Sequence, residues 1–278
     1  MITHPHVKIN LGLSVLRRRP DGYHDIETLF VPYHGLSDTL EIIVGDDWSE
    51  TSASLFARYA SSEIAQAIAP DGSLMVTLAR RGGVDWDPLK DLTARAYALL
   101  AADFKLPPMK IFLEKTAPVG AGLGGGSSDA AFALRMIADL AGLDLGEEAL
   151  AAYAARLGSD CAFFLHDRPM MGEGRGEILT PYDLDLSAFD LRVIVPDGIA
   201  VSTAEAYRGI VPREGISLRE TLSRPVEQWR DTLVNDFETT VFAAHPELAA
   251  LKQRLYDDGA LYASMSGSGS ALFALFAR

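Results

Sequence analysis

The feature that most constrains this chain is a glycine-rich loop at residues 118–128, which reads Pro-Val-Gly-Ala-Gly-Leu-Gly-Gly-Gly-Ser-Ser. The segment 109–114 before it is typical of a strand, and the alanine-rich, proline-free segment 129–141 after it predicts a helix. The first turn of a helix leaves N–H groups unpaired and carries partial positive charge, and glycine lets an anion approach the backbone. A strand, a glycine-rich loop and a helix in this order therefore predict a phosphate-binding site.

The loop does not fit either of two familiar phosphate-binding motifs. The Walker A motif requires a lysine directly after its last glycine, and this loop contains no lysine. The Rossmann motif requires Gly-x-Gly-x-x-Gly and an acidic residue about 20 positions further on. The glycines at 120, 122 and 124 have a different spacing, and Asp139 lies inside the predicted helix. A flexible linker that binds nothing is the alternative, although linkers rarely lead straight into a helix.

An early strand carries two polar side chains on one side. Residues 7–15 alternate apolar and other side chains, which predicts a half-buried strand with Lys8 and Asn10 on the same face. Pro20-Asp-Gly22 predicts a turn. Tyr23 and His24, directly after it, are either strand-end packing or a platform for a ring-bearing ligand.

The other elements are expected from local patterns. We expect strands at 26–31, 38–44, 73–80 and 191–196, a helical tendency at 49–69, and helices at 87–104, 146–157, 202–207, 226–244 and 246–258. The glycine-rich segment 172–176 predicts a connection, and a domain boundary near residue 167 divides the chain into 1–166 and 167–278. A closing hairpin at 260–276 has a tip of small residues, 264–270, which allows another backbone or a ligand to approach.

Asp160 is a single carboxylate that leads into the apolar run 161–165. Carboxylates avoid burial unless they are paired or useful. Asp160 is therefore either a cap of a helix or turn, or a general base or metal-facing acid.

Composition restricts the class of protein. The chain has 278 residues, enough for one large domain or two modest ones. Its net charge of −13 argues against a nucleic-acid-binding protein, which would carry a basic face. The single cysteine, Cys161, allows no internal disulfide and is typical of a reducing compartment, and no apolar run approaches the ~20 residues of a membrane span. We therefore expect a cytoplasmic protein with no nucleic-acid or membrane partner; the oligomeric state stays open.

Three of these segments together resemble the kinase superfamily named for galactokinase, homoserine kinase, mevalonate kinase and phosphomevalonate kinase (GHMP kinases). They are Val7-Lys-Ile-Asn-Leu11, the central Gly122-Leu-Gly-Gly-Gly-Ser-Ser-Asp-Ala-Ala131, and Met265-Ser-Gly-Ser-Gly-Ser270. The resemblance implies an α+β fold of two domains, a ribosomal-protein-like domain at 1–166 and a ferredoxin-like domain at 167–278. ATP, Mg²⁺ and a small-molecule substrate would meet between them.

A finer resemblance lies in Asp21-Gly-Tyr-His24, the triple glycine at 124–126 and Asn235-Asp-Phe-Glu238. These are most similar to the branch that phosphorylates the 2-hydroxyl of a cytidine diphosphate-linked methylerythritol, in non-mevalonate isoprenoid biosynthesis. Two other functions stay open: a sister kinase of the homoserine or mevalonate type, and a catalytically silent ATP-binding regulator. The family's Asp-Asn-Leu is Lys90-Asp-Leu92 in this chain, which leaves a nucleotide contact there open.

The resemblance also implies roles for particular residues. Lys8 and Asp160 match the family's catalytic pair. Asp160 would orient or deprotonate the attacking hydroxyl, while Lys8 would pair with it and offset charge on the transferring phosphoryl group. Asn10 would bind the substrate hydroxyl.

Further matches concern the two ligands. Tyr23 would stack on the cytosine ring, His24 would hydrogen-bond it, and Tyr207 would be a second stacking aromatic. Ser127 or Ser128 would reach Mg²⁺ or a phosphate. The ATP phosphates would be held by the whole loop: Pro118, Val119, Gly120, Ala121, Gly122, Leu123, Gly124, Gly125, Gly126, Ser127 and Ser128.

Overall fold

The computed structural model describes residues 1–212 and 217–278, which form two compact units. Unit 1 comprises Met1–Val7, Tyr33–Val119 and Gly125–Asp167. Unit 2 comprises Lys8–Pro32, Gly120–Gly124 and Arg168–Arg278. The strands β2 (His6–Arg18) and β3 (His24–Ser37) run from one unit into the other along the chain. The last change of unit falls at residue 167, and the division into domains at 1–166 and 167–278 stays a prediction.

Unit 1 is built on a sheet with the strand order β1-β4-β7-β6-β5. β6 and β7 are parallel, and the other pairs are antiparallel. The elements of unit 1 are β1 (Ile2–Thr3), β4 (Thr39–Val44), α1 (Ser52–Arg58), η1 (Ser61–Glu63), β5 (Ile64–Ile68), β6 (Leu74–Arg80), η2 (Pro88–Lys90), α2 (Leu92–Ala101), β7 (Met109–Lys115), α3 (Gly125–Leu140), α4 (Glu147–Leu157) and η3 (Cys161–Leu165).

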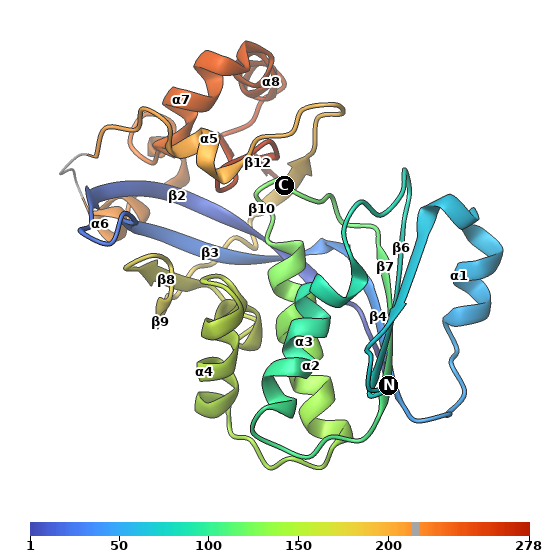
Figure 1. Ribbon diagram of the computed structural model, residues 1–278. Helices are drawn as coiled ribbons and strands as arrows, with labels where there is room; N and C mark the ends of the chain where they lie inside the picture. The colour runs from blue at the N-terminus through green and yellow to red at the C-terminus, as the bar shows by residue number, and fades with distance from the viewer. Residues whose placement is uncertain (213–216) are drawn as a thin grey trace. The chain divides into compact units, whose positions relative to one another are not determined.

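Both faces of the unit 1 sheet are covered by helices (Figure 1). Along β4, the consecutive residues Ile42 and Ile43 point to opposite faces and both are buried, as expected for a strand that is covered on both faces. Ile43 packs with Leu55 of α1, while α2 and α3 lie on the other side of the sheet.

Two aspartates start the segment that leads into α2. The Asp87 side chain accepts a hydrogen bond from Leu89 N and heads the short turn η2, with Pro88 at its first position. The Asp91 side chain accepts from Thr93 N and caps α2 itself. Asp91 therefore has a structural role as a helix cap. The segment 87–104, predicted as one helix, is a short turn followed by a shorter helix.

Unit 2 contains the antiparallel sheet β10-β12-β11. β3 and β8, and β8 and β9, also pair in antiparallel fashion, in a second sheet with the order β2-β3-β8-β9. The remaining elements of unit 2 are β8 (Met170–Glu173), β9 (Ile178–Pro181), β10 (Phe189–Ile194), α5 (Thr203–Tyr207), α6 (Leu218–Leu222), η4 (Val226–Gln228), α7 (Phe237–Ala244), α8 (Pro246–Asp257), β11 (Tyr262–Met265) and β12 (Leu272–Ala277).

Unit 2 joins the early strand to residues more than 200 positions later. Leu13 N donates to Val234 O, Asp236 N donates to Leu13 O, and the Asp236 carboxylate accepts from Val15 N at 2.8 Å. Leu13 and Val15 then pack in one core with Phe237 and the helices α7 and α8. A buried strand edge is thus satisfied by the segment 234–236, as buried backbone groups must be.

Three further expectations about local structure were also wrong in part. Residues 49–69 form a short helix and then the edge strand β5, because pairing with β6 overrides the helical pattern. The segment 172–176 is the end of β8 and the turn of a hairpin. The predicted helix 226–244 consists of η4 and α7 with a turn between them.

Candidate active site

Unit 2 brings together the three segments that carry the superfamily resemblance. Gly122 O accepts hydrogen bonds from Lys8 Nζ at 2.9 Å and from Ser266 Oγ at 3.0 Å. Lys8 N also donates to Leu123 O, and Ala271 N donates to Ala121 O. The early strand, the first half of the glycine loop and the late hairpin therefore form one hydrogen-bonded arrangement.

Lys8 and Asn10 lie on the same face of β2, as the alternation predicts, but residues 6–13 are buried on both faces, so the expectation of a half-buried strand is wrong. Lys8 and Asn10 are both only 3% exposed. Lys8 Nζ donates to Asn10 Oδ1, and Asn10 Nδ2 donates to Thr28 Oγ1 at 3.0 Å. A buried ammonium group requires such acceptors, so the amide and the loop carbonyl hold the Lys8 charge in place.

The segment Asn235–Glu238 holds the late hairpin. From the sequence alone, this segment had been noted only for its resemblance to the family. Asn235 Nδ2 donates to Met265 O and Gly267 O at 2.7 and 2.8 Å. The Glu238 carboxylate accepts from Met265 N at 2.8 Å and from Lys252 Nζ at 2.6 Å. These contacts fix the hairpin backbone that lies against Gly122.

Glycine is required at position 122 for two reasons. Its φ is 75°, and a Cβ there would lie 2.1 Å from Ser266 O. Gly120 has nearly the same φ, 73°, but a Cβ there meets nothing within 4 Å. A side chain would strain the backbone at both positions, but it would collide with neighbouring atoms only at position 122.

We expect Gly122→Ala to lower the free energy of unfolding by about 2 kcal/mol more than Gly120→Ala, because only the first collides with backbone. Urea unfolding of both variants measures the difference. Equal losses of unfolding free energy in the two variants would mean that the hairpin backbone does not restrict the side chain at position 122.

The second half of the loop is the first turn of α3, in unit 1. The helix begins at Gly125, four positions before the predicted start, so residues 125–128 supply its unpaired N–H groups. The Ser128 hydroxyl is fully buried and has no hydrogen-bond partner among the described residues, whereas Ser127 is half-buried. Pro118 and Val119, also in unit 1, precede the glycines.

A buried charge cluster lies at the end of β7, and the sequence reasoning missed it. Lys115 Nζ donates to a carboxylate oxygen of Asp38 and, at 2.6 Å, to one of Asp129. Asp38 also accepts from the N–H groups of Thr116 and Ala117, at 2.6 and 2.8 Å. The cluster fixes the start of the loop and the first turns of α3; a charged residue at the end of an apolar strand was its only local signal.

Charges in this cluster shift one another's pKa. Burial lowers the pKa of Lys115, but Asp129 and Asp38 outweigh it and hold that pKa well above its usual range. Burial raises the pKa of Asp129 well above its usual value, and the Asp38 charge adds to the rise. The lysine is therefore a fixed cation at neutral pH.

Asp160 lies in unit 1, directly before η3. Residues 161–165 are buried, but Asp160 is only half-buried, and Ser159 Oγ donates to it at 3.1 Å. Among the described residues, the Asp160 side chain accepts no capping hydrogen bond from a backbone N–H of η3. Burial raises the pKa of the neighbouring Cys161 thiol to about 11, so this cysteine is neutral and a poor nucleophile at neutral pH.

The aromatic residues predicted to bind substrate lie in unit 2. Tyr23 is 58% exposed, and the Arg175 guanidinium lies over its ring, 5.0 Å from the centroid. His24 stacks on Tyr207 with ring centroids 4.8 Å apart and planes inclined by 16°. Phe237 packs edge-on against Tyr207. His24 and Tyr207 are thus brought together, whereas Tyr23 is more than half exposed and has Arg175 over its ring.

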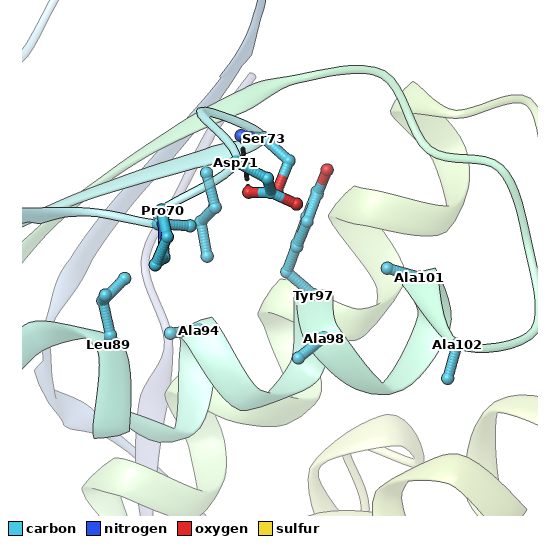
Figure 2. Close-up of a pocket in the computed structure, with 11 residues that line it drawn as sticks. Pro70, Asp71, Ser73, Leu89, Ala94, Tyr97, Ala98, Ala101 and Ala102 are labelled. Atoms are coloured by element: carbon cyan, nitrogen blue, oxygen red, sulfur yellow. Dashed lines mark hydrogen bonds between the residues drawn. The ribbon is translucent and has the colours of Figure 1, made fainter.

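A separate pocket of about 570 Å³ lies in unit 1, between the β5–β6 turn and α2 (Figure 2). Tyr97 and small alanine side chains of α2 form one wall. Its carboxylate, Asp71, accepts hydrogen bonds from Ser73 N and Ser73 Oγ. Among the described residues, no lysine, arginine or predicted site residue lines it, so this lining is not that of a phosphate site.

Two known protein-family models match parts of this chain. The model "GHMP kinases N terminal domain" matches residues 91–168, and "GHMP kinases C terminal" matches residues 218–278. The class is therefore that of the GHMP kinases, and the predicted α+β fold of this superfamily is confirmed.

Full-length relatives narrow the class. The chain is 44% identical to the 4-diphosphocytidyl-2-C-methyl-D-erythritol kinase of Azobacteroides pseudotrichonymphae, over 100% of this chain and 94% of the relative. It is 43% identical to the kinase of the same name from Bacteroides fragilis, over 99% and 92%. A crystal structure of 4-(cytidine 5'-diphospho)-2C-methyl-D-erythritol kinase is similar with a TM-score of 0.74 at 32% identity, covering 99% of this chain and 90% of that one.

The chain belongs to the 4-diphosphocytidyl-2-C-methyl-D-erythritol kinase family. It is accordingly an ATP-dependent kinase that acts on a small molecule, as predicted from the sequence. Within the described residues, no helix is both long and apolar enough to cross a membrane.

Proposed function

We propose that this chain transfers the γ-phosphoryl group of ATP to the 2-hydroxyl of 4-diphosphocytidyl-2-C-methyl-D-erythritol, in the cytoplasm. The observation that carries the substrate assignment is identity above 40% along essentially the whole chain to relatives with that name. The arrangement of Lys8, Gly122 and Ser266 supports it, because it joins the segments typical of the superfamily.

Phosphoryl transfer of this kind depends on positioning and electrostatics more than on a strong base. The substrate oxygen bonds to the γ-phosphorus, the bond from that phosphorus to the β–γ bridging oxygen breaks, and ADP leaves. Asp160 orients the hydroxyl and accepts its proton, and the Lys8 ammonium offsets charge on the transferring group. Asn10 holds the Lys8 ammonium and binds the substrate hydroxyl.

The loop supplies the phosphate contacts. The unpaired N–H groups at residues 125–128 carry the partial positive charge of a helix N-terminus, and the glycines keep side chains away from it. The buried, unpartnered Ser128 hydroxyl fits a hard oxygen ligand for Mg²⁺, which usually keeps several waters. When bound, Mg²⁺ neutralises charge on the β- and γ-phosphates.

A substrate panel tests the proposal. ADP release is measured with the cytidyl substrate, homoserine and mevalonate under the same conditions. The proposal requires a much higher kcat/KM for the cytidyl substrate. A preference for homoserine or mevalonate favours a sister kinase, and no multiple turnover with any of them favours a silent regulator.

Tyr23 is proposed to stack on the cytosine ring. Base–aromatic stacking is worth about 1–3 kcal/mol per base. We expect Tyr23→Ala to raise KM for the cytidyl substrate roughly tenfold or more and to leave KM for ATP nearly unchanged. The variant should fold because the side chain is exposed, and Trp48→Ala, which removes another exposed aromatic, is the matched control. Equal changes in both KM values would exclude a specific role in binding cytosine.

A further inference from the structure

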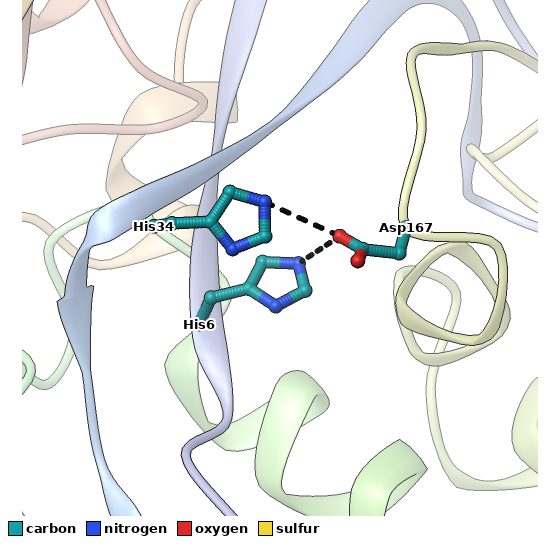
Figure 3. Close-up of side chains that lie close together, drawn as sticks. All are labelled: His6, His34 and Asp167. Atoms are coloured by element: carbon teal, nitrogen blue, oxygen red, sulfur yellow. Dashed lines mark ion pairs between the residues drawn. The ribbon is translucent and has the colours of Figure 1, made fainter.

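Two histidines and an aspartate converge in unit 1, outside the residues proposed for catalysis (Figure 3). His6 is at the start of β2, His34 is near the end of β3, and Asp167 follows η3. One nitrogen from each histidine and one carboxylate oxygen all lie within 4.8 Å of one another. Three separate chain segments thus direct metal-binding atoms at a common point.

The distances between these side-chain atoms match those between two ligands of one metal ion. Asp167 Oδ1 lies 3.3 Å from His6 Nε2 and 3.4 Å from His34 Nε2. Charge-assisted hydrogen bonds are usually shorter, about 2.7–2.9 Å. In a tetrahedral zinc site with bonds of about 2.0–2.1 Å, two ligand atoms are about 3.3 Å apart. The spacing therefore suits ligands around one ion better than it suits direct hydrogen bonds.

A second observation concerns His6 alone. Its side chain is buried, and its Nε2 atom has no hydrogen-bond partner among the described residues, although it points toward Asp167. A buried polar atom without a partner is costly, so such an atom in a native structure calls for an explanation. Phe132 and Phe164 pack edge-on against the His6 ring and hold it in this orientation.

We propose that His6, His34 and Asp167 bind a zinc ion. Imidazole and carboxylate are zinc ligands, and three protein ligands leave a fourth position for water. The His34 and Asp167 side chains are 65% and 57% exposed, which gives the ion a path from solvent. The bound ion ties the N-terminal segment to β3 and to the end of η3.

The test uses the nucleotide-free, full-length protein without a polyhistidine tag, titrated with Zn²⁺ in a calorimeter. Excess Mg²⁺ is present to saturate simple carboxylate sites, because Mg²⁺ prefers oxygen ligands. His34→Ala and Asp167→Asn remove one ligand each. Both positions are exposed, and asparagine tolerates the positive φ of 46° at residue 167, so both variants should fold.

We expect one Zn²⁺ per chain in the wild type and at least roughly tenfold weaker binding in each variant, since losing even an outer-shell partner costs about 10–100-fold. His4→Asn is the matched control, because His4 is exposed and close in sequence to His6. Its affinity should equal that of the wild type. The proposal is overturned if the wild type shows no saturable binding, if neither ligand variant weakens it, or if His4→Asn weakens it as much. Failure of the kinase assays would not alter these results.

Discussion

Asp160→Asn is expected to lower kcat by roughly 10²- to 10⁴-fold, the usual contribution of a positioned proton acceptor. Asparagine has nearly the same shape as aspartate but cannot take the proton that the substrate hydroxyl loses. KM for ATP should change little, because the loop and not Asp160 is proposed to hold the phosphates. Steady-state ADP release at saturating substrate measures the effect.

Asp144→Asn is the matched control for this change. Asp144 is an exposed aspartate of the same unit, between α3 and α4, and has no proposed role. Its kcat should equal that of the wild type. If Asp160→Asn retains near-normal kcat, Asp160 is not the proton acceptor, and its place before η3 is only structural.

The largest expected effect on stability comes from Lys115→Met. The change leaves Asp38 and Asp129 buried without their cation. Removing one partner of a buried ion pair typically costs about 3–5 kcal/mol. We expect a loss of that size in the free energy of unfolding, measured by denaturant titration at pH 7.

The pH dependence of Lys115→Met gives a signature of this cause. Burial already raises the pKa of Asp129, and removing the ammonium group raises it further. The native state then binds more protons than the unfolded chain, whose aspartates have a pKa of about 3.9. The loss of stability should therefore shrink as pH falls from 7 toward 4.

Lys110→Met is the control for Lys115→Met. Lys110 lies on the same strand and pairs with Asp46, but Asp46 is fully exposed. Surface ion pairs contribute little to stability, so this variant should be nearly as stable as the wild type. If both variants lose the same free energy of unfolding, burial of the charges does not explain how the cluster stabilises the protein.

Local pattern was enough to predict the elements next to the site. The alternation at 7–15 predicted β2 and the common face of Lys8 and Asn10, because a strand has a fixed period of two. The helix after the glycine loop was also predicted. Its start was placed four residues late, because glycine is a poor helix former and yet occupies the first turn here.

Other features depend on contacts between distant segments. Residues 64–68 contain alanine and glutamine, which favour helices, and become a strand only through pairing with β6. The cluster of Asp38, Lys115 and Asp129 joins segments up to 91 positions apart. The hydrophobic periodicity of the sequence cannot predict such contacts, since they form only once the sheet is folded.

The central claim is that this chain phosphorylates the 2-hydroxyl of the cytidyl-methylerythritol substrate at the expense of ATP. Carbon 2 of that substrate carries a methyl group and no hydrogen, whereas the other free hydroxyls lie on carbons that bear hydrogen. Proton-coupled ³¹P NMR of the reaction mixture therefore tests the claim directly. It should show ADP and one new phosphomonoester resonance without three-bond proton splitting. A split monoester resonance, or ADP formation without any new monoester, would contradict the claim.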